Sequence, residues 1–325
     1  MRIVVVGAGI AGLATARALA SVGLSCVVVE RGVRTSGYGI QLATAGAQLL
    51  EQWGVDLSFA MRLSERELRS WRSGELIARM PLEAPYCAMR RVDLHRALFP
   101  GGVVRGGRCV GVSDGAVHLA DGNTLAADLI IGADGLRSVV RRAVSADQVR
   151  SAGASAWRAA VRAPWSDPPR VRVWLGPGQH CVCYPIAPGL LNVVAVGSFF
   201  DDWHVDVFQL ISAARAAVRF ELFDRAPLAS RVAGRVALVG DAAHPMLPYL
   251  AQGASQAILD VAALAVALAE SSSVEAALLR YDAIRTPASA EVADAVRIAA
   301  HEHHLPDGPE QRSRDRRLAA IGADE

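Results

Sequence analysis

Short runs of apolar residues alternate with glycine-rich turns in the first part of the chain. The run Arg2–Val6 is unbroken and rich in β-branched residues, which is typical of a strand buried on both faces of a parallel sheet. Helical spacing of apolar residues follows over Leu13–Ser21, and Cys26–Glu30 is a second apolar run. This order predicts two parallel strands joined by a helix.

Buried strands of the same kind are predicted at Ala127–Gly132 and Val236–Val239, and a helix is predicted over Ala254–Glu270. The other segments lack long apolar runs, because turn residues interrupt them every few positions. We predict a hairpin over Leu68–Met80, strands over Val103–Val112 and Ala116–Leu119 joined by a turn at Asp114-Gly115, short strands from Trp157 to Val196, and helices over Thr44–Trp53 and Arg91–Leu98.

Rossmann-like elements therefore recur with sheet-like material between them. We predict an α/β fold in which a discontinuous Rossmann-like cofactor domain is interleaved with an antiparallel β-sheet substrate domain and followed by C-terminal helices. The expected boundaries are 1–66, 91–152 and 232–290 for the cofactor domain, 67–90 and 153–231 for the middle domain, and 291–325 for a C-terminal helix or disordered tail.

The turn after the first strand carries the pattern G-x-G-x-x-G at Gly7, Gly9 and Gly12. The first glycine permits a tight turn, the second lets a pyrophosphate approach the backbone, and the third lets the helix pack against the strand. Glu30 ends the second strand, where an acidic side chain can hold a ribose diol. Together these features indicate a dinucleotide site at a helix N-terminus.

Composition narrows the function further. The 325 residues are 52% hydrophobic with a net charge of +2, which fits a well-cored globular protein and does not favour a nucleic-acid partner. All 34 basic residues are arginine. Schiff-base chemistry and a lysine-containing phosphate loop are thereby excluded.

No metal site is expected. Cys181 and Cys183 alternate along a predicted strand and are interpreted as small buried hydrophobes. His301, His303 and His304 lack the one-turn spacing of a ligand pair, and we interpret them as an exposed helix end.

The chain opens on a core strand, so we predict a cytoplasmic protein without a signal peptide. We also expect no membrane span, because the longest apolar helical stretch found, near Ala262–Leu268, is too short.

Two further motifs each follow a predicted buried strand, namely Asp134-Gly135 and Gly240-Asp241. Alone, the first would be an ordinary turn and the second a helix cap. With all three motifs in order, the chain resembles the FAD-dependent aromatic monooxygenases of the para-hydroxybenzoate and salicylate hydroxylase type, the group A flavoprotein monooxygenases. The resemblance extends from Met1 to about Arg285 and implies a discontinuous FAD-binding domain of the GR2 type.

The resemblance also implies roles for individual residues. Arg91 would reach the FAD, Val110 would lie beside the adenine, Asp134 would be linked to both FAD and the nicotinamide cofactor, and Asp241 would bind the ribityl hydroxyls. The cofactor-binding residues expected on this basis are Gly7, Gly9, Ile10, Ala11, Gly12, Glu30, Arg31, Gln41, Arg91, Val110, Asp134, Gly135, Asp241, Pro248, Gln252, Gly253 and Ala254.

One position departs from the family. Ala251 stands where the family usually has glycine, just before the helix that would face the flavin. If this position needs a positive φ, the extra Cβ would strain the loop.

The activity that the resemblance implies is hydroxylation of an aromatic or polyketide-like, polycyclic small molecule. NADH or NADPH would reduce FAD, and oxygen would add to the reduced ring as a C4a-hydroperoxide. The catalytic candidates are His180 and Tyr184, which share one face of a strand, and Tyr249 beside the flavin loop. Trp157 and Arg158 are expected to open the inserted sheet and to line or brace the pocket.

Two other functions remain open for this fold: a flavin-dependent reductase or dehydrogenase, and a flavoprotein without turnover that sequesters a reactive intermediate. A hydrolase is not favoured, because no G-x-S-x-G elbow precedes a helix. The protein is expected to be a monomer or homodimer.

Overall fold

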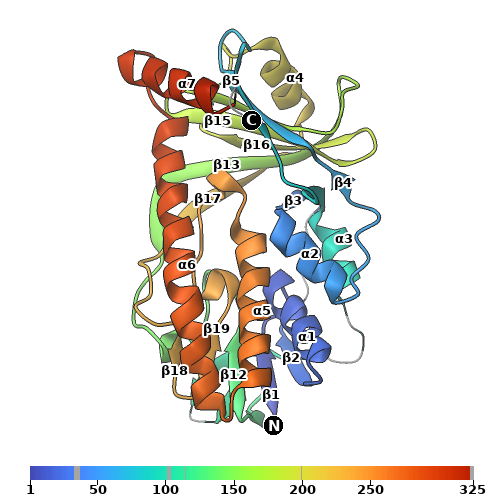
Figure 1. The fold of residues 1–325 in the computed structure, drawn as a ribbon, viewed down its shortest axis with the longest axis vertical. Coiled ribbons are helices and arrows are strands. Elements are labelled where there is room, and N and C mark those ends of the chain that lie inside the picture. The colour runs from blue at the N-terminus through green and yellow to red at the C-terminus, as the bar shows by residue number, and fades with distance from the viewer. Residues whose placement is uncertain (33–36, 100, 102–103, 114, 199, 323–325) are drawn as a thin grey trace.

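The computed structural model describes residues 1–32, 37–99, 101, 104–113, 115–198 and 200–322. Parts of three predicted features, at Val103, Asp114 and residues 323–325, lie outside this range. Figure 1 shows two layers along the long axis, with a parallel sheet and its helices at one end and a large, mainly antiparallel sheet at the other.

The parallel sheet forms as the sequence predicts. Its six strands run in the order β18 (Val232–Ala233), β19 (Val236–Leu238), β12 (Leu129–Gly132), β1 (Ile3–Val6), β2 (Cys26–Glu30) and β8 (Val104–Gly106). Only β18 is antiparallel to its neighbour. Because parallel strands point the same way, the turns after β1, β2, β12 and β19 meet at one edge of the sheet.

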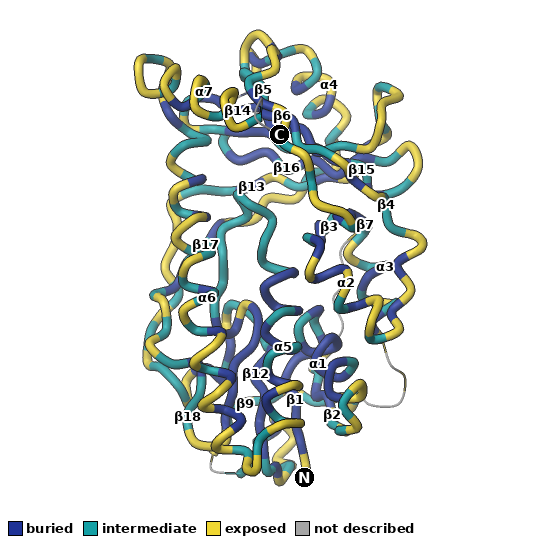
Figure 2. Tube along the Cα trace, in the orientation of Figure 1, coloured by how far each residue is buried: buried dark blue, intermediate teal, exposed yellow. Residues whose placement is uncertain are grey.

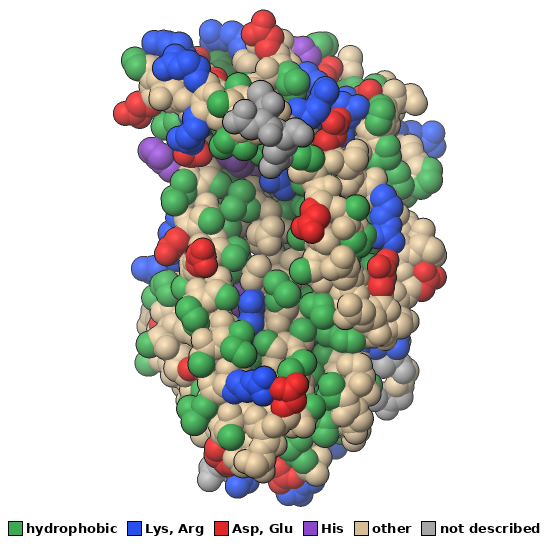
Figure 3. Space-filling model, in the orientation of Figure 1, with side chains coloured by type: hydrophobic (Ala, Val, Ile, Leu, Met, Phe, Trp, Pro, Cys, Tyr) green, Lys and Arg blue, Asp and Glu red, His purple; other side chains and the backbone are tan. Residues whose placement is uncertain are grey.

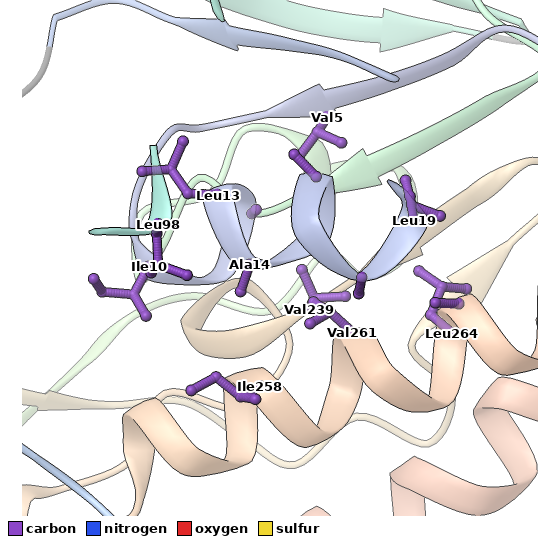
Figure 4. Close-up of a cluster of buried hydrophobic side chains, with 14 of the residues drawn as sticks. Val5, Ile10, Leu13, Ala14, Leu19, Leu98, Val239, Ile258, Val261 and Leu264 are labelled. Carbon is purple, nitrogen blue, oxygen red and sulfur yellow. The ribbon is translucent and has the colours of Figure 1, made fainter. Parts of the chain in front are cut away.

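Helices and a small sheet cover the two faces of this parallel sheet. On one face lie α1 (Ile10–Ser21) and α5 (Gly253–Glu270), with α2 (Thr44–Gln52) and α3 (Arg91–Leu98) beside them. Figure 4 shows the resulting core, in which Ala14 of α1 points toward α5, with its Ile258 and Val261, and Leu13 lies on the other side of α1. The other face packs against a small antiparallel sheet of β9 (Cys109–Ser113), β10 (Ala116–Leu119) and β11 (Thr124–Ala126).

The prediction of one strand over Val103–Val112 is wrong. The pairing of β8 with β2 ends at Gly106, and the Gly107 N–H then donates to the Glu30 carbonyl at 2.9 Å. It next changes direction and enters the small sheet as β9. Local hydrophobicity gave no sign of this change, since both halves are strand-like.

The second layer is a seven-stranded sheet in the order β17 (Val218–Asp224), β13 (Arg150–Arg162), β16 (Leu190–Val196), β15 (Gln179–Ala187), β14 (Val171–Gly176), β5 (Glu65–Ser70) and β6 (Leu76–Pro81). Among the described strands of this sheet, only β14 and β5 pair in parallel. The predicted hairpin is β5–β6. Trp157 and Arg158 lie in the middle of β13 and do not open the sheet as predicted. Helix α4 (Val205–Ala213) packs on the face that carries Cys181 and Cys183, which are buried as predicted.

Three short strands, β3 (Gly39–Leu42), β7 (Cys87–Arg90) and β4 (Met61–Arg62), connect the layers, and single 3₁₀ turns occur at η1 (Val140–Ala143), η2 (Gly240–Ala242) and η3 (Pro248–Leu250). The split of the chain into a cofactor and a middle domain at the expected boundaries stays a prediction.

Of the two alternatives expected for 291–325, the described residues form helix and not a disordered tail. Helix α6 (Val274–His303) runs from the parallel sheet to the seven-stranded sheet, and α7 (Pro309–Ile321) lies against β6 (Figure 1). Figure 2 shows that the chain between these helices is partly buried. Leu305 is buried there and Leu318 packs on the cluster beneath β6.

Helix α5 begins one residue before the predicted Ala254–Glu270, but its apolar stretch is longer than the predicted Ala262–Leu268. It has the length and apolar composition of a membrane span, although half of it is buried inside the protein. It packs against α1, α2 and α6 and carries the fully buried Asp260. On the face in Figure 3, hydrophobic side chains are interspersed with charged ones along these helices. We therefore interpret α5 as a core helix.

Candidate functional site: a cavity between the two layers

A cavity of about 900 Å³ extends from the carboxyl edge of the parallel sheet to the inner face of the seven-stranded sheet. Nearly all the residues predicted from the sequence line it. Those that do are Gly7, Gly9, Ile10, Ala11, Glu30, Arg31, Gln41, Arg91, Val110, Asp134, Gly135, His180, Tyr184, Asp241, Pro248, Gln252, Gly253 and Ala254. Gly12 and Tyr249 are the two predicted residues outside this lining.

Gly7, Gly9 and Gly12 have different structural roles. Gly7 has φ 104°, and a Cβ there would lie 2.5 Å from the Ala133 carbonyl oxygen. A Cβ on Gly12 would lie 1.8 Å from the Gly7 carbonyl oxygen, so Gly12 permits close packing without reaching the cavity. Gly9 has nothing within 4 Å of a built Cβ and no side chain caps α1 after it. The free N–H groups of α1 are thus open to an anionic ligand.

Backbone N–H groups hold the Glu30 carboxylate, which lines the cavity. Its Oε2 accepts from the Ala8 N–H at 2.8 Å and its Oε1 accepts from the Gly32 N–H at 2.9 Å. These bonds fix the direction of the carboxylate while leaving lone pairs for further donors, since each oxygen can accept more than one hydrogen bond. Sugar hydroxyls are suitable donors.

The Asp134 carboxylate is largely occupied by its own loop. It accepts from Ser138 Oγ at 2.5 Å and from the Val139 N–H at 2.6 Å, which organises the turn η1. Burial raises the pKa of this carboxyl against the opposing effect of these hydrogen bonds. Asp134 lines the cavity, and its observed contacts indicate that it shapes the loop around a ligand.

A second uncapped helix N-terminus faces the cavity at α5. Gln252 is the N-cap residue of α5, and no side chain makes a capping hydrogen bond there. Asp241 lies nearby, with one carboxylate oxygen 4.0 Å from the position that a Cβ on Gly253 would take. The Asp241 side chain is exposed to the cavity. Two uncapped helix N-termini that line one cavity favour a ligand that carries negative charge at more than one place.

Ala251, just before α5, has φ 55° and ψ 29°. It is the single non-glycine residue with positive φ among the described residues. The position thus has the positive φ that favours glycine, and the Cβ of Ala251 strains the loop in this left-handed conformation.

The sequence did not reveal a cluster of buried charged groups around Asp260, which lies behind this loop and is called the hub below. Asp260 is fully buried on α5, and its Oδ1 accepts from Arg231 Nη1 at 2.8 Å and from Arg285 Nε at 2.9 Å. Its Oδ2 accepts from the Gly240 N–H at 2.9 Å and lies 2.5 Å from His244 Nε2. Burial opposes ionisation, but His244 and the two arginines hold the pKa of Asp260 well below its ordinary value. The hub fixes the Gly240-Asp241 turn relative to α5.

The far wall of the cavity is one face of the seven-stranded sheet. Strand pairing places Arg158 of β13 opposite Val194 of β16, which is opposite Val182 of β15. His180 and Tyr184 flank Val182 on the same face, as their parity predicts. Burial raises the pKa of Tyr184 to about 12, with Arg158 and a hydrogen bond to Gln41 opposing that rise.

Arg158 is unusual within this wall. Its Nε is buried without a hydrogen-bond partner, and no carboxylate of the described chain forms an ion pair with its guanidinium. Its recorded ring contact is with Phe220, whose centroid lies 5.5 Å from the guanidinium carbon. Burial lowers the pKa of Arg158.

The expectation of exposure at the end of α6 is wrong for His303 and His304. His304 Nε2 lies 2.8 Å from His180 Nδ1, and the His180 ring lies 5.4 Å from the His303 ring between centroids. Tyr249 packs on the same group, 5.1 Å from the His180 ring. Tyr249 therefore contacts the His180 ring without lining the cavity itself. No cluster of metal ligands occurs among the described residues.

His95 is another cavity residue that the sequence did not single out. Its Nε2 lies 2.8 Å from the Ala8 carbonyl oxygen. Neither His95 nor His304 belongs to a spacing motif, so no local pattern could have identified them.

The donor set fits FAD. Two free helix N-termini, a glycine surface that accepts a pyrophosphate, and carboxylates at Glu30 and Asp241 lie along one cavity. These are the groups that a dinucleotide with two polyol segments requires.

Comparisons with known proteins agree with this interpretation. Residues 5–66 match the NAD(P)-binding Rossmann-like domain and residues 210–296 match the FAD binding domain. The chain is similar to 3-amino-4-hydroxybenzoate 2-monooxygenase of Streptomyces cremeus, with 41% identity covering 98% of this chain and 92% of that protein. It is also similar to 3-hydroxybenzoate 6-hydroxylase of Klebsiella oxytoca, with 29% identity covering 94% and 89%.

Among solved structures, HpxO of Klebsiella pneumoniae complexed with FAD and uric acid superposes with a TM-score of 0.89. The two chains are 26% identical, and the match covers 98% of this chain and 92% of HpxO.

Proposed function

Because this chain belongs to the family of FAD-dependent aromatic monooxygenases, we propose that its substrate is a phenol bearing a carboxylate, of the 3-amino-4-hydroxybenzoate type. The enzyme uses FAD and a nicotinamide reductant to hydroxylate an aromatic small molecule. The observation that supports the finer proposal is Arg158, a half-buried arginine whose Nε is buried without a hydrogen-bond partner and which has no carboxylate partner in the described chain. A cation partly removed from water is stabilised by an anionic partner, and a substrate carboxylate would supply one.

A relative from Streptomyces cremeus gives further support. The compound after which it is named, 3-amino-4-hydroxybenzoate, carries one carboxylate, one phenol and one amino group on a single ring. The cavity wall offers a cation at Arg158 and, on the same face, a histidine and a tyrosine. These groups match a ring that is anionic at one end and hydroxylated at the other.

In the proposed arrangement each protein group has a defined task. Arg158 holds the carboxylate, and the apolar pair Val182 and Val194 contacts the ring. His180 accepts the phenolic proton at Nε2, which raises the electron density of the ring carbon to be hydroxylated. The pKa of His180 is well below its ordinary value because of burial and the neighbouring histidines, so the imidazole is neutral and able to accept.

The cofactor residues complete the arrangement. Gly9, Glu30, Asp241 and the N-terminus of α5 would hold FAD along the cavity. When bound, FAD supplies the activation of molecular oxygen with electrons from NADH or NADPH. The surrounding sheet and helices exclude water from the ring, which limits wasteful loss of reducing equivalents.

Ligand binding to FAD-loaded enzyme tests the carboxylate proposal. We would titrate 3-amino-4-hydroxybenzoate and 2-aminophenol, which lacks the carboxylate, and follow the flavin absorbance. Arg158→Gln should weaken binding of the benzoate about 10- to 100-fold, in line with about 1.5–3 kcal/mol for a charged hydrogen bond, and leave 2-aminophenol unchanged.

The matched control is Arg162→Gln, which changes an exposed arginine on the same strand. It should behave as the parent enzyme does. Equal weakening of both ligands by Arg158→Gln would show that Arg158 only braces the sheet. Mass spectrometry of the turnover product should show the gain of one oxygen atom.

We also propose a cytoplasmic location, since all five cysteines are free and cytosolic proteins rarely form disulfides. Whether the enzyme is a monomer or a homodimer stays a prediction.

A further inference from the structure

The end of helix α6 brings a second imidazole to the histidine that lines the cavity. His180 lies on β15 and His304 follows α6, yet His180 Nδ1 and His304 Nε2 are 2.8 Å apart. At that distance one nitrogen donates a proton to the other. The remaining nitrogen of His180, Nε2, is the one available to a ligand in the cavity.

His304 is well placed to pass a proton onward. It is partly exposed, whereas His180 is only 2% exposed. Arg314 of α7 donates to the Glu302 carbonyl, and the Gly178 N–H donates to the His304 carbonyl at 3.0 Å. These contacts hold the end of α6 against β15 and keep the two rings in register.

We propose that His304 accepts the proton that His180 removes from the phenolic substrate, so that the two imidazoles form a proton exit from the cavity. The proposal rests on the proposed function of His180. The phenolic O–H bond breaks as an N–H bond forms at His180 Nε2, and the proton on His180 Nδ1 passes to His304 Nε2. His304 Nδ1 then releases a proton to solvent, so both imidazoles are neutral again, the oxygen that lost the proton stays in the cavity as a phenolate, and no redox change occurs. His304 acts through His180 and is therefore a positioning residue.

The surroundings favour neutral rings in the resting enzyme. The groups facing the pair are His303 and Tyr249, and Arg66 and Arg314 act on His303. None of these groups is an acid that would trap a proton on the pair. Burial lowers the pKa of His304 to about 4, which lets it release a proton readily near neutral pH.

The test follows ionisation of a bound phenol rather than turnover. FAD-loaded enzyme is mixed with 3-amino-4-hydroxybenzoate in a stopped-flow instrument, and phenolate absorbance is recorded from pH 5 to 9 in water and in deuterium oxide. His304→Ala should slow phenolate formation at least tenfold, and 50 mM imidazole should restore part of the rate. His304→Gln should also be slow, since an amide cannot accept and release the proton in turn.

The matched control is His301→Gln, at an exposed histidine one turn earlier on the same helix end. It should ionise the ligand at the parent rate. FAD content and melting temperature show whether each variant is folded. Parent-like ionisation rates and pH profiles in both His304 variants would overturn the proposal.

A second measurement separates this proposal from the proposed function. Nitrogen-15 spectra of histidine-labelled, ligand-free enzyme report the tautomer of each ring. If His304→Ala shifts the His180 nitrogens while His301→Gln does not, the coupled pair exists whatever the substrate. If the parent enzyme binds the benzoate without ionising it, His180 is not its base and the proton exit is overturned, whereas the carboxylate proposal and the coupled pair remain.

Discussion

At the scale of single residues, the site depends on a few positions where conformation or charge is tightly constrained. Ala251 occupies a left-handed conformation that glycine adopts freely, and Asp260 is an acid buried among cations. Both lie at the junction between the Gly240-Asp241 turn and α5. Substitutions at these two positions should have opposite effects on stability.

Ala251→Gly should stabilise the protein by about 0.5–1 kcal/mol, because relief of left-handed strain exceeds the entropy lost on ordering glycine. FAD binding should be equal or tighter, as measured by quenching of flavin fluorescence. The control Ala283→Gly lies on the exposed side of α6 and should destabilise by about 1 kcal/mol. Weaker FAD binding in Ala251→Gly would show that local contacts favour the alanine.

Asp260→Asn should destabilise the protein by about 3–5 kcal/mol, because it leaves two buried arginines without their counter-charge. Urea unfolding followed by circular dichroism measures this change. Asp294→Asn, which removes an exposed acid from α6, should change stability by less than about 0.5 kcal/mol. A loss below about 1 kcal/mol in Asp260→Asn would mean that the amide satisfies the hub.

At the scale of elements, the C-terminal helices matter more than their composition suggested. Helix α6 reaches from one layer to the other and ends at the cavity wall, and α7 covers β6 (Figure 1). Leu318 of α7 packs on the cluster that contains Leu68 and Tyr184. The last helix therefore supports the part of the seven-stranded sheet that lines the cavity at Tyr184.

Leu318→Ala should lower the free energy of unfolding by about 1–2 kcal/mol, less than for a fully buried leucine because the side chain is half-buried. The melting temperature should fall accordingly. Leu279→Ala on α6 provides the comparison, since Leu279 is 68% exposed and its loss should be nearly neutral. Equal melting temperatures for the two variants would contradict the proposed support.

At the scale of the whole molecule, function depends on how the two layers enclose one cavity. The parallel sheet presents its turns from one side, and the seven-stranded sheet presents Arg158, His180 and Tyr184 from the other. Three histidines are neutral where these layers and α6 meet. Their protonation therefore bears on the stability of the assembled molecule as well as on chemistry.

Acid should destabilise the protein through these histidines. Burial lowers the pKa of His303 to about 3 and of His304 to about 4, whereas both would be near 6.5 in the unfolded chain. Below pH 6.5 the unfolded chain binds protons that the folded chain does not. Stability from this source is complete above about pH 6.5 and is lost as the pH falls toward 4.

Urea unfolding at pH 8, 6.5 and 5 measures this dependence. The variant His303→Gln should lose less stability than the parent between pH 6.5 and 5, since it removes one of the titrating groups. His301→Gln, at an exposed position, should keep the parental slope. An identical slope in all three proteins would assign the acid sensitivity to other groups.

The sequence by itself determined the parallel sheet, the FAD-type turn and the face that His180 shares with Tyr184. Each depends on local rules: β-branched runs form buried strands, glycines permit one turn geometry, and alternate residues of a strand share a face. Only the tertiary structure decided that Asp260 meets Arg231 and Arg285, that Val104–Val112 divides between two sheets, and that His304 reaches His180 across 124 positions of the chain. Those contacts join elements distant in sequence, and their geometry is set by packing between layers, which a local pattern does not encode.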